Sequence, residues 1–255
     1  MRDALAVTGL RKSFGGVDAI TDVTFTVPAG TATALIGPNG AGKTTLFNLV
    51  THLLPVTAGQ IAYFGRTLTS QPPERIARMG LIRTFQTARI FPGMTVLENV
   101  LAGAHLHVSS SALAQMLWAP RARREEDLLR TRADALLELV GLQAARARPA
   151  SDLPMGGQKL LEVVRALMAQ PRLLLLDEPA AGLNESETAE LSDVLRAIRG
   201  VGITLLVVEH NMALVMDVAD QVVVLDAGRI VAAGTPLQIR ADPAVIEAYV
   251  GRLDS

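Results

Sequence analysis

The sequence has 255 residues, of which 49% are hydrophobic and 19% charged, so it contains enough apolar material for a packed core and is not broadly disordered. The net charge of −1 at pH 7 excludes a global electrostatic attraction to nucleic acid. The absence of cysteine excludes disulfides, thiol catalysis and cysteine-ligated zinc.

The apolar runs are too short to span a membrane. Mean hydropathy is +0.32, yet the strongest runs, Leu173–Leu176 and Ile203–Val208, have the length of strands, whereas a spanning helix needs roughly 18 residues. The sequence opens with Met-Arg-Asp and no apolar signal segment, so we expect a cytoplasmic location.

The first third predicts strands and one helix. Residues 23–27 alternate apolar side chains with threonine, which is typical of a half-buried strand. Residues 31–36 predict a buried strand that leads into a glycine-rich loop, and a helical pattern begins at Gly42. Residues 60–64 predict another short strand.

The middle of the chain, roughly 87–164, predicts helices. One helical face collects the apolar side chains of Leu129, Ala133, Leu136, Leu137 and Val140. The charge run at 121–127 is either an interaction patch or the solvated start of this helix, and residues 108–119 predict a loop with a short helix. We interpret the middle as a helical subdomain inserted into an α/β core.

The last third returns to alternating strands and helices. Buried strands are expected at 173–176 and 203–208, and a hairpin at 222–232. Asn184 with Glu187 three residues later predicts a capping box at the start of a helix. The alternation predicts the α/β class.

A phosphate-binding loop lies between the strand at 31–36 and the following helix. It reads Gly37-Pro38-Asn39-Gly40-Ala41-Gly42-Lys43-Thr44 and matches the pattern of a P-loop. Glycines let backbone N–H groups turn toward phosphate oxygens, and the helix N-terminus adds partial positive charge. Lys43 is expected to reach the β- and γ-phosphates, and the Thr44 hydroxyl to ligate Mg²⁺.

An acidic pair, Asp177 and Glu178, follows the apolar run at 173–176. Ligands of open α/β sheets bind beyond the carboxyl ends of the strands. We therefore expect Asp177 to hold Mg²⁺ and Glu178 to polarise the water that attacks the γ-phosphate. Together with the P-loop, this pair predicts a P-loop NTPase.

Five further segments occur in a specific order along the chain. They are Phe14 before Gly15-Gly16, Gln86 in Arg83-Thr84-Phe85-Gln86, the run Leu153-Pro154-Met155-Gly156-Gly157-Gln158, the run Ala181-Gly182-Leu183-Asn184, and His210 after the strand at 203–208. With them, the chain resembles the nucleotide-binding subunit of an ABC transporter over nearly its whole length.

The resemblance implies a RecA-like P-loop NTPase core at 1–86 and 165–255, with an N-terminal antiparallel β part and a helical subdomain at 87–164 that carries the signature motif. It implies that Phe14 stacks on adenine, that Gln86 touches Mg²⁺ and the γ-phosphate, and that His210 is the switch histidine. ATP contacts would come from the P-loop with Thr45, and from the signature residues Pro154, Gly156, Gly157 and Gln158.

The resemblance is specifically to the branched-chain amino acid importers, and it is carried by the segments 83–86, 89–100, 178–184, 234–236 and 242–251. The basic, helical insertion near 105–140 resembles the longer of the two ATPase subunits of these importers. Three signature positions depart from the usual pattern. Pro154 replaces Ser, Met155 the first Gly, and Gly157 the usual Gln.

The resemblance also implies partners. ATP and Mg²⁺ would be sandwiched between this chain and a second ABC ATPase subunit, identical or different, which together drive two membrane permease subunits served by a periplasmic binding protein. The chain would lie peripherally on the cytoplasmic face of the inner or plasma membrane and bind no nucleic acid. Alternative functions are amide or urea import, lipopolysaccharide export, a non-transport role on ribosomes or DNA, and a regulatory module that binds ATP without hydrolysing it.

Overall fold

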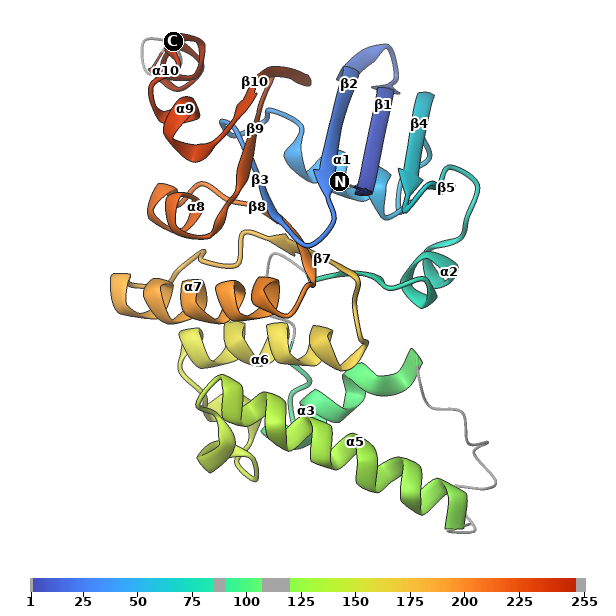
Figure 1. Ribbon diagram of the computed structural model, residues 1–255, viewed down its shortest axis with the longest axis vertical. Helices are drawn as coiled ribbons and strands as arrows, with labels where there is room; N and C mark the ends of the chain where they lie inside the picture. Colours follow the sequence, from blue (N-terminus) through green and yellow to red (C-terminus); the bar gives the residue numbers. More distant parts are fainter. Residues whose placement is uncertain (1, 85–89, 107–119, 251–255) are drawn as a thin grey trace. The chain divides into compact units, whose positions relative to one another are not determined.

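The computed structural model describes residues 2–84, 90–106 and 120–250 (Figure 1). The chain forms two compact units. One, termed the core unit here, comprises Met1–Gln86, Arg172–Ala181 and Thr188–Ser255; the other, the helical unit, comprises Thr87–Pro171 and Gly182–Glu187.

The core unit contains two sheets. An antiparallel sheet has the order β2-β1-β4-β5, and a six-stranded sheet has the order β10-β9-β3-β8-β7-β6, parallel except for the β9–β10 hairpin. The strands are β1 (Asp3–Phe14), β2 (Val17–Pro28), β3 (Ala32–Ile36), β4 (Ala58–Tyr63), β5 (Arg66–Thr67), β6 (Leu81–Arg83), β7 (Leu173–Asp177), β8 (Thr204–Val208), β9 (Gln221–Asp226) and β10 (Arg229–Gly234). The strands expected at 23–27, 31–36, 60–64, 173–176 and 203–208 and the hairpin are confirmed.

Helices bury both faces of the six-stranded sheet. Helix α1 (Lys43–Val50) places Leu46, Phe47, Leu49 and Val50 in one apolar cluster with side chains of both sheets. On the opposite face, Val215, Ile239 and Val245 pack with alternate side chains of β3 and β9. These three come from α8 (Met212–Val218), α9 (Pro236–Arg240) and α10 (Pro243–Val250). The core unit also contains α2 (Pro73–Arg78) and most of α7 (Glu185–Gly200).

Among its described residues, the helical unit contains α3 (Val96–Ala102), α5 (Pro120–Leu139), α6 (Met155–Met168) and the first turn of α7, with short 3₁₀ turns at Gly103–Leu106, Gln143–Ala145 and Ala150–Asp152. Thr95 and Glu98 form a capping box at the start of α3. The apolar helical face predicted from Ala133 and Leu137 lies on α5 and is confirmed, because both side chains are fully buried. The charge run forms the first turns of α5, and the loop predicted at 108–119 lies outside the described residues.

Among the described residues, no helix combines the length and the apolar character needed to cross a membrane.

Candidate functional site

The P-loop joins the buried strand β3 to α1, as the motif predicts. Gly37 has φ 152° and Gly42 has φ 103°, a region that favours glycine. A Cβ at Gly37 would lie 2.0 Å from the carbonyl oxygen of Leu225, and one at Gly42 would lie 2.9 Å from that of Ala19. The loop is therefore packed so closely against neighbouring backbone that both positions require glycine.

Lys43 lies inside this loop with 8% of its surface exposed. Its Nζ donates to the carbonyl oxygens of Gly37 at 2.7 Å and Pro38 at 3.0 Å. Burial lowers the pKa of Lys43, and the carboxylates of Glu178 and Asp177 oppose that shift. The ammonium is thus held at the N-terminus of α1, within the electrostatic reach of both acidic residues.

Asp177 ends β7 and is 2% exposed. Its Oδ2 accepts from Arg83 of the neighbouring strand β6 at 2.7 Å, and Arg83 also donates to Asn48 Oδ1 at 2.6 Å. The other oxygen, Oδ1, is buried and has no hydrogen-bond partner among the described residues. An anionic oxygen left without a donor in this environment is suited to a cation.

Glu178 is held by its backbone at the carboxyl end of the sheet. Its N–H donates to the carbonyl oxygen of Val208 at 2.9 Å, which extends the β7–β8 ladder by one residue. Its φ is 48°, a conformation uncommon for residues other than glycine. The surrounding backbone therefore fixes the position of the Glu178 Cα, from which the carboxylate side chain extends.

His210 is exposed and follows β8, so it lies after a strand that pairs with both β3 and β7. Its N–H donates to the side chain of Glu209 at 2.9 Å, and the Glu209 side chain also accepts from Ala180 at 2.7 Å. Strand order thus brings the P-loop, the acidic pair and His210 to one edge of the sheet.

Phe14 ends β1 with 45% of its surface exposed, so it is not a core residue. The Nζ of Lys12 lies 4.8 Å from the centre of the ring and donates to the carbonyl oxygen of Pro55 at 2.9 Å. The side chain of Thr44 is exposed, and that of Thr45 is partly buried. Gln86, expected at the metal and the γ-phosphate, lies outside the described residues.

The signature segment belongs to the helical unit. Pro154 is the N-cap residue of α6, and Gly156 and Gly157 are buried in its first turn. Gln158 Nε2 turns back to the carbonyl oxygen of Leu153 at 2.9 Å. The helix N-terminus therefore carries backbone donors, with no hydroxyl at position 154.

The predicted capping box at α7 is confirmed. The N–H of Glu187 donates to Asn184 Oδ1, and the N–H of Asn184 to Glu187 Oε2, each at 3.0 Å. Glu187 Oε1 also accepts from the N–H of Gly156 at 3.3 Å. One carboxylate thus links the segment 181–184 to the start of α6.

Sequence reasoning missed the roles of Arg83 and Glu209 in this arrangement, and also the hydrogen bond that Glu187 accepts from Gly156. Arg83 and Glu209 had a usable signal, because each is a charged residue directly at the end of an apolar strand. The contact from Glu187 to Gly156 had none, since 31 residues separate the two positions.

Comparisons with known proteins agree with this geometry. A family model described as "ABC transporter" matches residues 20–181, and one described as "Branched-chain amino acid ATP-binding cassette transporter" matches residues 229–254. The high-affinity branched-chain amino acid transport ATP-binding proteins LivG of Salmonella typhimurium and BraF of Pseudomonas aeruginosa are each 43% identical to the chain. The alignments cover 97% of both chains for LivG and 98% for BraF.

A crystal structure of an ATP-binding cassette of an ABC transporter, in its ADP conformation, superposes with a TM-score of 0.86 at 32% identity, covering 98% of this chain and 100% of that chain. The resemblance predicted from the motifs is confirmed. The chain therefore belongs to the ABC transporter family, with the ATP-binding proteins of branched-chain amino acid transport among its relatives.

Proposed function

We propose that the chain is the ATP-hydrolysing subunit of a membrane importer for branched-chain or related amino acids. The observation that carries this proposal is the meeting of Lys43, Asp177, Glu178 and His210 at one sheet edge. The relatives named above support the transport role and the class of cargo.

The residues divide the work of phosphoryl transfer. Lys43 and the N-terminus of α1 neutralise the phosphates. Glu178 accepts a proton from the attacking water while the oxygen of that water bonds to the γ-phosphorus. The bond from the γ-phosphorus to the β,γ-bridging oxygen breaks, and ADP and phosphate are left. His210 and Gln86 contact the γ-phosphate, and Phe14 stacks on adenine.

The residues present fit a Mg²⁺ ion. Asp177 Oδ1 is buried without a donor among the described residues, and hard oxygen ligands of this kind suit Mg²⁺. Asp177, the Thr44 hydroxyl and Gln86 would hold the ion. When bound, it supplies positive charge that offsets the negative charge on the phosphate oxygens.

A complete site needs a second ATPase subunit. The signature residues Pro154, Gly156, Gly157 and Gln158 contact the γ-phosphate held by the partner, and the partner's signature completes the site of this chain. In this proposal, residues 87–164 form the signature-bearing subdomain, and closure of the two subunits around ATP drives the permease subunits at the cytoplasmic face of the membrane. A periplasmic binding protein delivers the cargo.

Substitution of Glu178 tests the proposal. Glu178→Gln keeps the size of the side chain but removes its ability to take a proton, so turnover should fall by about a hundredfold or more, or about 2.7 kcal/mol of barrier. ATP binding, measured by isothermal titration calorimetry with Mg²⁺, should persist. Turnover within about threefold of wild type would exclude Glu178 as the base.

A further inference from the structure

Glu209 is a buried acidic residue that belongs to none of the sequence motifs. Its exposed fraction is 0%. A buried carboxylate is costly unless hydrogen bonds compensate for the water it has lost. Three backbone N–H groups do so here: Ala180 donates to Oε1 at 2.7 Å, and His210 and Asn211 each donate to Oε2 at 2.9 Å.

These donors come from two separate loops. Ala180 lies two residues after Glu178, in a turn closed by the bond from Ala181 N–H to the carbonyl oxygen of Glu178 at 3.1 Å. The other two donors belong to the loop that carries His210 and leads into α8. The Glu209 carboxylate is therefore a direct link between the two loops.

We propose that Glu209 is a positioning residue for ATP hydrolysis, which fixes the loop of Glu178 against the loop of His210. This inference rests on the proposed function, since it requires Glu178 to act on the attacking water while His210 contacts the γ-phosphate that this water attacks. The left-handed backbone of Glu178 strengthens the argument, because such a conformation persists only where the surroundings hold it.

A carboxylate is the group that this position needs. It accepts hydrogen bonds at both oxygens, whereas glutamine has one oxygen and one NH₂ group, which only donates. In Glu209→Gln the NH₂ group must face either Ala180 N–H or the pair from His210 and Asn211. In both orientations one loop loses its acceptor while the side chain keeps its size.

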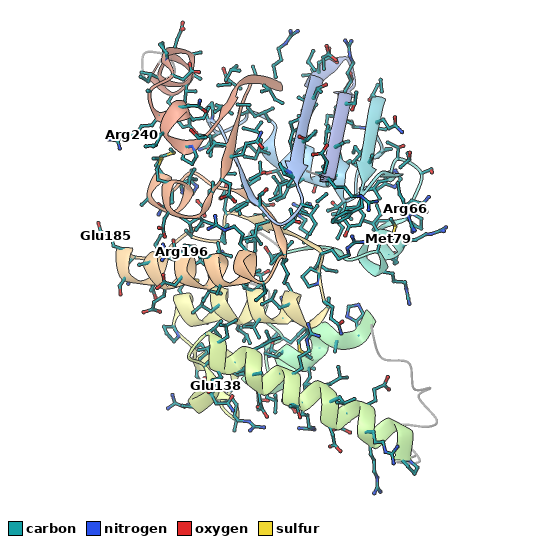
Figure 2. All side chains as sticks on the ribbon, in the orientation of Figure 1. Arg66, Met79, Glu138, Glu185, Arg196 and Arg240 are labelled. Carbon is teal, nitrogen blue, oxygen red and sulfur yellow. The ribbon has the colours of Figure 1, made fainter. Side chains whose placement is uncertain are left out.

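The test measures phosphate release by the full-length chain, assembled with its transporter subunits where turnover requires them. Glu209→Gln should lower the turnover number by about tenfold or more, as expected for misplaced catalytic groups. The affinity for ATP should change by less than about threefold, because the P-loop is not touched. Glu138→Gln is the matched control, since Glu138 is an exposed glutamate on α5 (Figure 2), and it should leave both quantities unchanged.

A double substitution separates this role from a purely structural one. If Glu209 acts through the groups it positions, adding Glu209→Gln to Glu178→Gln should slow turnover by less than about threefold beyond the single variant. If the two substitutions lowered turnover by independent factors that multiply in the double variant, the inference would be overturned. Equal losses of ATP affinity and turnover in Glu209→Gln would also overturn it.

The controls also separate the two proposals. Wild-type turnover in a folded Glu209→Gln overturns the positioning role alone, whereas wild-type turnover in Glu178→Gln contradicts the proposed function. If Glu209→Gln does not fold, Glu209→Asp takes its place, with the same split between turnover and affinity expected. Its carboxylate is one methylene shorter and cannot span the same contacts, so unchanged turnover in that variant also overturns the inference.

Discussion

The ion pair between Arg83 and Asp177 lies inside the proposed site and leads to a quantitative prediction. The two side chains are 10% and 2% exposed, and their charged atoms are 2.7 Å apart. Arg83→Met keeps much of the apolar volume of the side chain but leaves Asp177 as a buried, unpaired charge. Breaking a buried pair from one side costs about 3–5 kcal/mol.

This loss should be visible in thermal unfolding. For chains of this size, 1 kcal/mol corresponds to about 2–4 °C in melting temperature, so Arg83→Met should lower it by roughly 6–20 °C. Circular dichroism and scanning calorimetry measure the change. Adding Asp177→Asn should restore part of the loss, because the second substitution removes the stranded charge.

The matched control is Arg196→Met on α7 (Figure 2). Arg196 pairs with Asp193 and Asp217, but its side chain is 43% exposed, and such surface pairs contribute about 0–1 kcal/mol. If Arg83→Met melts within about 2 °C of wild type while the control behaves as expected, the substitution costs less than about 1 kcal/mol of stability. That result would contradict the assignment of a stabilising buried pair.

Three further predictions concern ATP and partner subunits. Lys43→Ala removes the buried cation of the P-loop and should lower ATP affinity by about tenfold or more; affinity within a few-fold of wild type, by isothermal titration calorimetry, would contradict the P-loop assignment. Met94 and Phe91 are apolar side chains that are 41% and 45% exposed, and we expect the permease subunits to dock on them. Met94→Glu should therefore reduce recovery of the assembled transporter but spare ATP binding by the isolated chain; unchanged recovery would place this docking site elsewhere. Pro154→Ser adds a hydroxyl at the start of α6 that can donate a charge-assisted hydrogen bond, of roughly 1.5–3 kcal/mol, to the γ-phosphate held by the partner subunit. It should raise the ATPase rate of the assembled complex several-fold if the two ATP sites are unequal; an unchanged rate would show that the N-terminus of α6 already compensates for the missing hydroxyl.

Local patterns predicted the strands and the P-loop because both are contiguous in the sequence. The four leucines at the start of β7, Leu173–Leu176, are fully buried, and a continuous apolar run is the direct sign of such a strand. Gly37 and Gly42 of the P-loop are required by backbone that lies close to them in the fold, and one motif of eight consecutive residues contains both.

Contacts between distant segments could not be predicted in this way. Arg83 and Asp177 are 94 residues apart, and Ala180 and Glu209 are 29 apart. They meet because β6, β7 and β8 are neighbours in the sheet, whereas hydrophobic periodicity reports that a strand is buried and not which strand lies beside it. The motifs name residues that act on ATP, but not the residues that hold them in place.

The contact between Glu187 and Gly156 has a consequence for how these segments can vary. A Cβ at position 156 would lie 2.7 Å from Glu187 Oε1, closer than side-chain atoms tolerate, so even alanine there would displace the carboxylate. The displaced group would also leave the N–H of Asn184 at the start of α7. A single methyl group on one helix would thus weaken the beginning of another, and substitutions at positions 156 and 187 should be accepted as pairs more readily than one at a time.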